Sequence, residues 1–391
     1  MPAKAARLNN LPPYVFATIG DRIRQMESQG KKIFRLDIGN PDMPPPDAVV
    51  DCLCAASQDP NNHGYTGYRG KVNFRKAVAQ YYESRFGVSV NPDTEVLPVI
   101  GSKEGLINLS LAYLDDGDLA LVPDIGYPSY EMGARIAGAD THYIQLDPEN
   151  DYFPVLDSVS DDTFSRAKLL WINYPNNPTG ACIDLEQYRT VAEKCLQHDV
   201  LLVSDNPYVD VTYDGQQGYS VLQVTDTRAP VVEFMSLSKS YNMAGWRLGA
   251  AVGSAEVIRN LLQMKSNIDS GHFGPIYDAG VAALDTPQEW IDNRNVIYER
   301  RRDRIMSLLP EIGLSAQIPH GSLYVWAKVE NGMSARDYVE QALEHAQVSL
   351  APGEAYGPGG HGFVRISVGV PDAELDEALD RMQTWQSGLG R

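Results

Sequence analysis

Short apolar runs recur through the middle of the chain and are separated by longer amphipathic stretches. Each run is short, almost wholly apolar and bounded by turn-forming residues, which is typical of strands buried on both faces of a sheet. We expect such strands at residues 95–100, 118–123, 168–174, 200–205 and 231–236. Pro98 weakens the first prediction, because proline cannot donate a hydrogen bond to a neighbouring strand.

The stretches between several of these runs have helical periodicity. The clearest is 185–198, where Tyr188, Val191, Ala192 and Cys195 form one apolar stripe. Alternation of buried strands with helices indicates an α/β fold with a mainly parallel central sheet covered by helices on both faces. Ligands of such sheets bind beyond the carboxyl ends of the strands, so residues at those ends are candidates for a site.

The pattern changes from about residue 287 onward. A long charged helix is expected over 290–309, followed by strands at 321–326 and 363–368. We therefore predict a large domain over residues 40–285. A smaller α+β domain would combine residues 1–39, which include an N-terminal arm, with residues 286–391.

Composition narrows the function classes. The chain has 391 residues, 43% hydrophobic and 21% charged, as in ordinary globular proteins. Its net charge of −18 argues against nucleic acid as a partner, because phosphate backbones are bound by concentrated Lys and Arg. No apolar run is long enough for a transmembrane helix, and the N-terminus lacks a signal-peptide core. The four cysteines form no C-x-x-C pair, which favours reduced thiols over a metal site. We expect a cytoplasmic protein without a metal or a membrane partner.

Lys239 is the most informative single residue. It lies in the run 236–249, between Ser238 and Ser240, with Arg247 eight positions further on. A lysine can hold the aldehyde of pyridoxal phosphate (PLP) as a Schiff base, and serines with an arginine can hold its phosphate. The alternative is a solvated surface lysine, so the prediction depends on the other parts of a PLP site.

Two polar segments follow predicted strands and could supply those parts. Asp205 ends one strand, where a carboxylate could keep the pyridine nitrogen of PLP protonated; the alternative is a residue that caps the following turn. Asn177, in a turn-rich segment, and Tyr208 could hydrogen-bond the phenolic oxygen of the cofactor. The alternative for the segment of Asn177 is an ordinary turn.

A third segment, 101–105, follows a strand and opens a helix expected over 106–114. Free N–H groups at a helix start suit a phosphate, which Ser102 and Lys103 would bind together with Ser236, Ser238 and Arg247. The alternative for Ser102 is an ordinary N-cap. Tyr127 could stack on the cofactor ring or simply pack in its turn.

Arg365 interrupts an apolar strand over 363–368. A buried guanidinium is costly unless it is paired, and its fork matches a carboxylate. The partner could be the carboxylate of a substrate or one of the 51 acidic residues of the chain.

Taken together, these segments resemble the class I/II aminotransferase family, the fold-type I PLP enzymes, over about residues 12–370. The blocks that carry the resemblance occur in the order of the family: 36–42, 65–75, 101–105, 173–180, 205–208, 236–249 and 364–367. The resemblance implies the PLP-transferase fold, PLP as cofactor, and transfer of an amino group from an L-amino acid to a 2-oxo acid.

The resemblance also implies roles for individual residues. Lys239 would be the Schiff-base lysine, and Arg365 would bind the α-carboxylate of the substrate with help from Gly39 and Asn177. Tyr65 would reach the phosphate of the neighbouring subunit, which implies a homodimer with shared active sites. The remaining cofactor ligands would be those already named: Ser102, Lys103, Tyr127, Asn177, Asp205, Tyr208, Ser236, Ser238 and Arg247.

Within the family, the chain is most similar to LL-diaminopimelate aminotransferases and their relatives, on the runs 11–16, 101–105 and 265–271. Tyr14 matches a position that faces the distal end of the substrate there. Tyr68, however, stands where some plant-type members have a glutamate that meets the distal ammonium group. LL-diaminopimelate with 2-oxoglutarate is therefore the first expectation, and an alanine- or aspartate-type enzyme is the alternative.

Two rival functions share the same residues. A PLP lyase or synthase on this scaffold would eliminate at Cβ or Cγ instead of transferring nitrogen. A non-catalytic effector domain of a transcription regulator would need an added DNA-binding domain, for which only about 35 residues precede the first block.

Overall fold

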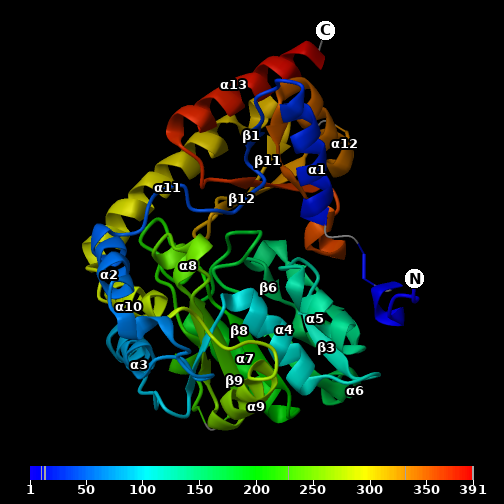
Figure 1. Cartoon of the computed structure of the whole chain (residues 1–391). Helices are drawn as coiled ribbons and strands as arrows, with labels where there is room; N and C mark the ends of the chain where they lie inside the picture. The colour runs from blue at the N-terminus through cyan, green and yellow to red at the C-terminus, as the bar shows by residue number, and fades with distance from the viewer. Residues whose placement is uncertain (10, 13–14, 228, 331, 390–391) are drawn as a thin grey trace.

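Two β-sheets, each with its own helices, make up most of the chain (Figure 1). The computed structural model describes residues 1–391 except 10, 13–14, 228, 331 and 390–391. None of the helices in this described part is both long and apolar enough to cross a membrane.

The larger sheet has seven strands, of which only β10 runs against its neighbours. The predicted mainly parallel sheet is thus confirmed. β2 lies at its edge, which explains how Pro98 is tolerated within a strand. The strand order is β2 (Val96–Val99), β10 (Gly249–Gly253), β9 (Val231–Ser236), β8 (Leu201–Asp205), β7 (Ala167–Ile172), β3 (Leu119–Pro123) and β4 (Asp140–Ile144).

The sequence pattern did not predict β4 and β10. The sequence of β4, Asp-Thr-His-Tyr-Ile, is polar because the strand lies at the second edge of the sheet, where one side is left unpaired. The sequence of β10 consists of small residues, because β10 is fully buried between its two neighbours. Neither segment has the continuous run of large apolar side chains by which a buried strand is recognised.

Helices cover both faces of this sheet. Alternate residues of β7 point to opposite faces: Leu169 and Trp171 pack in one apolar cluster, Leu170 and Ile172 in the other. The first face is covered by α4 (Ser102–Tyr113), α5 (Ser129–Ala137) and α9 (Ala255–Lys265), and the second by α3 (Val72–Phe86), α7 (Leu185–Gln197) and α10 (Gly274–Leu284), with α2 (Asp47–Ser57) packed on α10.

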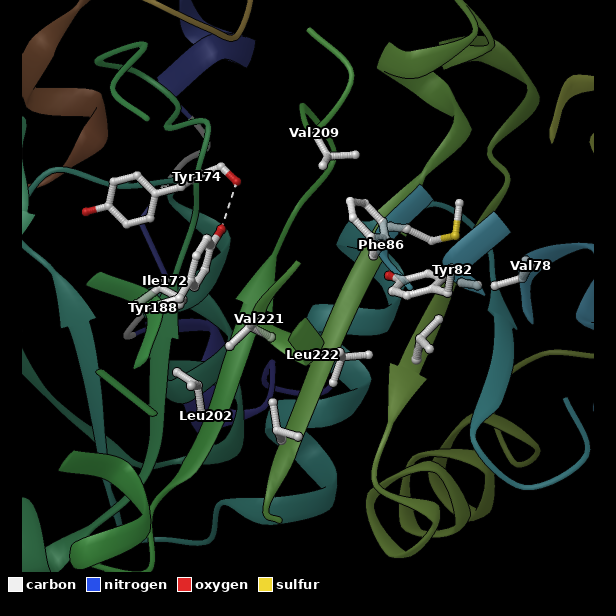
Figure 2. Packing of buried hydrophobic residues seen from close by; sticks show 14 of the residues in the cluster. Val78, Tyr82, Phe86, Ile172, Tyr174, Tyr188, Leu202, Val209, Val221 and Leu222 are labelled. Atoms are coloured by element: carbon white, nitrogen blue, oxygen red, sulfur yellow. Dashed lines mark hydrogen bonds between the residues drawn. The ribbon is translucent and has the colours of Figure 1, made fainter. Parts of the chain in front are cut away.

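Figure 2 shows part of the second face. Tyr188 of α7 packs beside Ile172 and Leu202, and its hydroxyl donates to the carbonyl of Tyr174 at 3.2 Å. The predicted helix at 185–198 is confirmed, and a capping box between Asp184 and Gln187 begins it. These contacts hold the segment after β7 in place, where the predicted turn of Asn177 begins.

The smaller sheet is antiparallel, in the order β11 (Leu314–Ser315), β12 (Tyr324–Val329), β15 (Phe363–Ser367) and β14 (Ala351–Pro352). The strand expected at 321–326 begins only at Tyr324. Ser322 has a left-handed backbone (φ 62°), and Gly321 forms an isolated bridge to Thr212 instead. Around this sheet lie α11 (Gln288–Leu308), α12 (Ala335–Gln341), α13 (Asp372–Leu389) and the parallel pair β1 (Phe34–Arg35) and β13 (Val348–Ser349).

The remaining elements are short or terminal. They are α1 (Val15–Ser28), α6 (Asp161–Arg166), α8 (Leu237–Ser240), β5 (Leu146–Asp147) and β6 (Phe153–Pro154). One π-helical turn, Ala342–Ala346, and several 3₁₀ turns complete the described elements: Ala6–Asn9, Pro60–His63, Pro148–Asn150, Leu156–Ser158, Val221–Gln223, Ala244–Trp246, Leu309–Ile312, Gly353–Tyr356 and Pro358–Gly360.

Candidate active site

A cavity of about 400 Å³ lies where the carboxyl ends of the large-sheet strands face the smaller sheet. Twelve of the fourteen predicted site residues line it: Gly39, Ser102, Lys103, Tyr127, Asn177, Asp205, Tyr208, Ser236, Ser238, Lys239, Arg247 and Arg365. The fold thus brings together residues that lie up to 326 positions apart (39 to 365) in the sequence.

The other two predicted residues are placed differently. Tyr65 is 92% exposed and does not line the cavity of its own chain. Tyr14 lies outside the described residues.

Lys239 reaches the cavity from the one-turn helix α8. The side chain of Ser236 caps that helix by accepting a hydrogen bond from the N–H of Ser238 at 3.2 Å. The Nζ of Lys239 donates to the carbonyl oxygen of Gly39. Burial, together with the nearby cations Arg365 and Arg247, lowers the pKa of Lys239 to about 7. A large share of this amine is therefore neutral near pH 7, as a nucleophile or a base requires.

Asp205 is the last residue of β8 and is buried. The hydroxyl of Tyr130 donates to its Oδ2 at 2.8 Å, whereas its buried Oδ1 has no hydrogen-bond partner within the described chain. Burial raises the pKa of Asp205 to about 7, although the bond from Tyr130 acts in the opposite direction. An open acceptor on a buried carboxylate suits a protonated ring nitrogen, which would supply both the missing donor and a positive charge.

The start of α4 forms a cationic cradle. Gly101 is its N-cap, with φ 71° and no side-chain cap, so the alternative of Ser102 as an ordinary N-cap is wrong. The buried Oγ of Ser102 finds no hydrogen-bond partner among the described residues. A Cβ at Gly101 would lie 2.2 Å from a guanidinium nitrogen of Arg247, so only glycine lets that cation approach the helix start. A hydroxyl without a hydrogen-bond partner, a helix start and the nearby guanidinium of Arg247 together fit a phosphate.

The main chain of Arg247 is itself held in a left-handed conformation (φ 55°). The Nε2 of His272 lies 2.6 Å from the carbonyl oxygen of Arg247. Because a carbonyl can only accept, this ring nitrogen must carry the proton, which leaves Nδ1 facing the hydroxyl of Tyr277 at 3.4 Å. Burial lowers the pKa of His272 and favours this neutral form.

Arg365 enters the cavity from β15 of the smaller sheet. Its guanidinium lies over the ring of Tyr324 at 3.9 Å and over the ring of Tyr356 at 4.9 Å. Nη1 donates to Oδ1 of Asn177 at 2.9 Å, and Nη2 donates to the carbonyl of Asp37 at 2.7 Å. Both sheets thus fix the guanidinium plane, which is the condition for bidentate binding of a carboxylate.

Several residues at this site were missed by the sequence analysis. One is Tyr324: its hydroxyl lies 2.8 Å from that of the predicted Tyr208, and a Cβ at the predicted Gly39 would lie 1.8 Å from the same hydroxyl. Also missed were Tyr130, Asp37, Tyr356, Arg35 and Asn173. Arg35 pairs with Asp37 through two hydrogen bonds of 2.8 Å. Asn173 donates to the carbonyl of Asp205 at 2.6 Å. The run that contains Tyr127 also contains Tyr130, which was the only available signal for that residue.

PLP fits this arrangement on its own chemistry. The structure offers an amine for the aldehyde, a buried carboxylate oxygen for the ring nitrogen, a cationic helix start for the phosphate and an aromatic side chain, Tyr127, beside the cavity. No group of three or more His, Cys, Asp or Glu side chains in the described chain could hold a metal ion.

Comparison with known proteins agrees with this chemistry. Residues 31–382 match the family described as "Aminotransferase class I and II". An LL-diaminopimelate aminotransferase of Dehalococcoides mccartyi is 42% identical over 97% of this chain and 98% of its own length. Substrate-bound BacF of Bacillus subtilis has a TM-score of 0.94 at 35% identity, with 98% of each chain covered. A probable N-succinyldiaminopimelate aminotransferase of Thermus thermophilus has a TM-score of 0.89 at 37% identity, with 95% of this chain and 100% of that chain covered.

The family match spans most of the chain, and the fold and the cavity agree with it. The predicted fold class, cofactor and enzyme class are therefore confirmed. The chain belongs to the class I and II aminotransferase family and is a PLP-dependent aminotransferase.

Proposed function

We propose that this enzyme moves an amino group from LL-diaminopimelate to 2-oxoglutarate. We assign to its residues the roles predicted from the sequence, with Lys239 as the catalytic residue. Arg365 binds the α-carboxylate, Asp205 binds the ring nitrogen, and Asn177 and Tyr208 bind the phenolic oxygen of the cofactor. Ser102, Lys103, Ser236, Ser238 and Arg247 bind the phosphate.

When bound, PLP supplies an electron-accepting ring that stabilises negative charge at the substrate Cα. The residues do the remaining work. Arg365 fixes the carboxylate so that the Cα–H faces Lys239. The Nζ of Lys239 takes that proton and returns it to the C4′ carbon of the cofactor. Its pKa of about 7 leaves both protonation states populated near neutral pH, as a group that first accepts and then donates a proton needs.

The observation that carries the substrate assignment, besides the similarity to enzymes of that name, is the space beside the site. A neighbouring cavity of about 450 Å³ shares the wall residues Lys103, Tyr127 and Tyr356 with the first one. The carboxylates of Glu131 and Glu354 also line it. A long substrate would find room there, and its distal ammonium would find carboxylates, whereas alanine would use neither.

The first experiment is to titrate the purified holoenzyme with single amino acids in the absence of any 2-oxo acid, following the visible absorption of the cofactor. We expect LL-diaminopimelate to convert the spectrum at the lowest concentration and Lys239→Ala to give no conversion. Conversion by alanine or aspartate, with no response to LL-diaminopimelate, would move the substrate assignment to those alternatives. Release of ammonia and a 2-oxo acid over many turnovers without an acceptor would indicate the lyase instead.

The proposal includes a homodimer with shared sites. Exposed apolar side chains gather on two segments, 65–72 and 268–273, which are joined by a 3.3 Å hydrogen bond from Thr66 to the carbonyl of His272. They are Tyr65, Tyr68, Val72, Ile268 and Phe273, with exposed fractions between 41% and 92%. Exposed apolar side chains gathered on two neighbouring segments favour a protein interface. In a dimer, Tyr65 would reach the phosphate of the partner's site.

Mixing two inactive variants tests this sharing. Lys239→Ala and a Tyr65 variant such as Tyr65→Asp each damage a different part of the site. If sites are shared, a dimer that contains one chain of each keeps one site with both native residues, so the mixture regains activity. A mixture that stays inactive, or a monomer in sedimentation, would contradict the shared dimer.

The domain limits near residues 39 and 285 and the cytoplasmic location stay predictions within this proposal. The four free cysteines agree with a reducing compartment. Cell fractionation tests the location, and limited proteolysis tests the domain limits.

A further inference from the structure

Three buried arginines lie on the long helix α11, and one of them differs from the others. Arg301 pairs with Asp42 at 2.8 Å and also with Asp372, and Arg302 pairs with Asp214 at 2.5 Å. Arg294 is equally buried, at 3% exposure, yet it forms no ion pair with any carboxylate of the described chain. A buried cation without a carboxylate must be satisfied in another way.

Main-chain carbonyls satisfy Arg294. Its Nη1 donates to the carbonyl of Lys239 at 2.8 Å and also to the carbonyl of Ser240, and its Nη2 donates to the carbonyl of Asp210 at 2.6 Å. The neighbouring Asn295 supports this arrangement: its Oδ1 accepts from Nη2 at 2.7 Å, and its Nδ2 donates to the same Asp210 carbonyl at 3.0 Å.

These bonds tie two parts of the active site to one cation. Lys239 and Ser240 belong to α8, which has only four residues and is too short to be stable by itself. Asp210 lies two residues beyond Tyr208, on the loop that follows β8. The guanidinium therefore fixes the main chain of Lys239 relative to the loop that carries Tyr208, with three donors in one rigid plane.

We propose that Arg294 is a positioning residue for Lys239, holding the main chain of the lysine so that Nζ reaches the carbon atoms between which it moves a proton. This inference rests on the proposed role of Lys239. We assign Arg294 a geometric role because it contacts the main-chain carbonyl of Lys239, whereas the cations that lower the pKa of the Lys239 amine are Arg365 and Arg247. Misplacement of a reacting group by about 1 Å can cost about 100-fold in rate.

The test replaces Arg294 by Met and by Lys. We expect Arg294→Met to lower the single-turnover rate of cofactor conversion by about 10- to 100-fold, with little change in the amino-acid concentration at half-saturation. The rate at which PLP attaches to the apoprotein, followed by its absorption, should fall as well. Arg294→Lys should recover part of both rates, because an ammonium group can still reach one or two of the carbonyls. A Cα-deuterated substrate should show a larger isotope effect in Arg294→Met, because proton transfer becomes slower.

Arg302→Met is the matched control, since it removes an equally buried cation from the same helix without contact to Lys239. We expect it to lower the melting temperature but to keep the attachment rate and the isotope effect of the parent. If Arg294→Met does not fold, Asn295→Ala should show the same changes in smaller size. Parental rates in folded Arg294→Met and Asn295→Ala, or equal losses in Arg302→Met, would overturn the inference. Full activity of Lys239→Ala would instead refute the proposed function itself.

Discussion

Two buried carboxylates on adjacent strands of the seven-stranded sheet differ in how many hydrogen-bond donors surround them. Glu233, in the interior of β9, accepts hydrogen bonds from the hydroxyls of Tyr82 at 2.9 Å, Ser204 at 3.1 Å and Ser220 at 2.7 Å, and from the N–H of Val221 at 3.1 Å. Asp205, at the end of β8, accepts a side-chain bond from Tyr130 alone among the described residues.

Burial raises the pKa of both acids, but the four donors around Glu233 act against that rise. Glu233 is therefore saturated: it links α3, β8 and the turn at Ser220, and it has little capacity left for a ligand. Asp205 has one oxygen without a hydrogen-bond donor among the described residues, and it lies at the carboxyl end of its strand, where ligands of such sheets bind. The difference separates a carboxylate that stabilises the fold from one that reduces stability until a cofactor binds.

The sharpest test replaces each acid by its amide. Asp205→Asn cannot keep a ring nitrogen protonated, so kcat should fall by about 10²- to 10⁴-fold. Glu233→Gln should keep kcat near that of the parent in the folded holoenzyme. Steady-state kinetics at saturating PLP measures both. Comparable losses of kcat in the two variants would remove the distinction.

A second expectation concerns the pH dependence of apoprotein stability. The pKa of Asp205 is about 7 in the folded chain against 3.8 ordinarily, so the folded state holds an extra proton between these values and stability falls as pH rises through that window. The pKa of Lys239 is about 7 against 10.5, so the unfolded chain holds the extra proton between these values and stability rises with pH there. Within its window, each group changes the unfolding free energy by about 1.4 kcal/mol per pH unit. The unfolding free energy of the apoprotein should therefore pass through a minimum near pH 7.

Urea unfolding of apoprotein across this range measures that minimum. Relative to the parent, Asp205→Asn should gain stability from about pH 4 to pH 7 and no more above it. Lys239→Met should have its full advantage below about pH 7 and lose it towards pH 10. Parallel pH profiles of the parent and both variants would contradict the shifted pKa values.

A third expectation concerns Glu233 alone. Glu233→Gln turns one acceptor oxygen into a donor that faces other donors, which should cost about 1–3 kcal/mol of unfolding free energy. Because Glu233 does not line the cavity, the loss should be the same in apo and holo protein. A loss confined to the holo protein would place Glu233 in the function of the site.

The smallest effects should come from the tyrosines that serve the two acids. Tyr130→Phe removes the only side-chain donor to Asp205 among the described residues and should raise the pKa of that carboxyl further. Tyr82→Phe removes one of four donors to Glu233. Each should cost about 0.5–1.5 kcal/mol of stability, but only Tyr130→Phe should shift the pH profile of kcat, by a few-fold at most. Equal pH profiles for both variants would count against the comparison.

The sequence was sufficient to predict Asp205 but not Glu233 or Tyr130. Asp205 ends an apolar run, and that position indicates the carboxyl end of a strand in a parallel sheet, where ligands bind. Glu233 sits inside a strand where a charged residue looks misplaced, because the hydroxyls that satisfy it come from residues as far away as Tyr82. Tyr324 could not be predicted either, since its hydrogen bond with Tyr208 forms only when the two sheets meet.

Tyr65 is 92% exposed in the single chain, so its predicted contact requires the surface of a partner subunit, which neither the sequence pattern nor one folded chain supplies. Short elements cannot be predicted from sequence periodicity. The helix α8, which carries Lys239, has only four residues, too few to show a helical period.

The open oxygen of Asp205 and the buried amine of Lys239 also have a consequence for the living cell. Both groups lower the stability of the newly made apoprotein near neutral pH, and binding of PLP removes this destabilisation. The vitamin B6 supply then acts on the abundance of the enzyme as well as on its activity. A chain that acquires its cofactor late spends longer in the forms that proteases and chaperones recognise, so vitamin starvation should shorten its half-life.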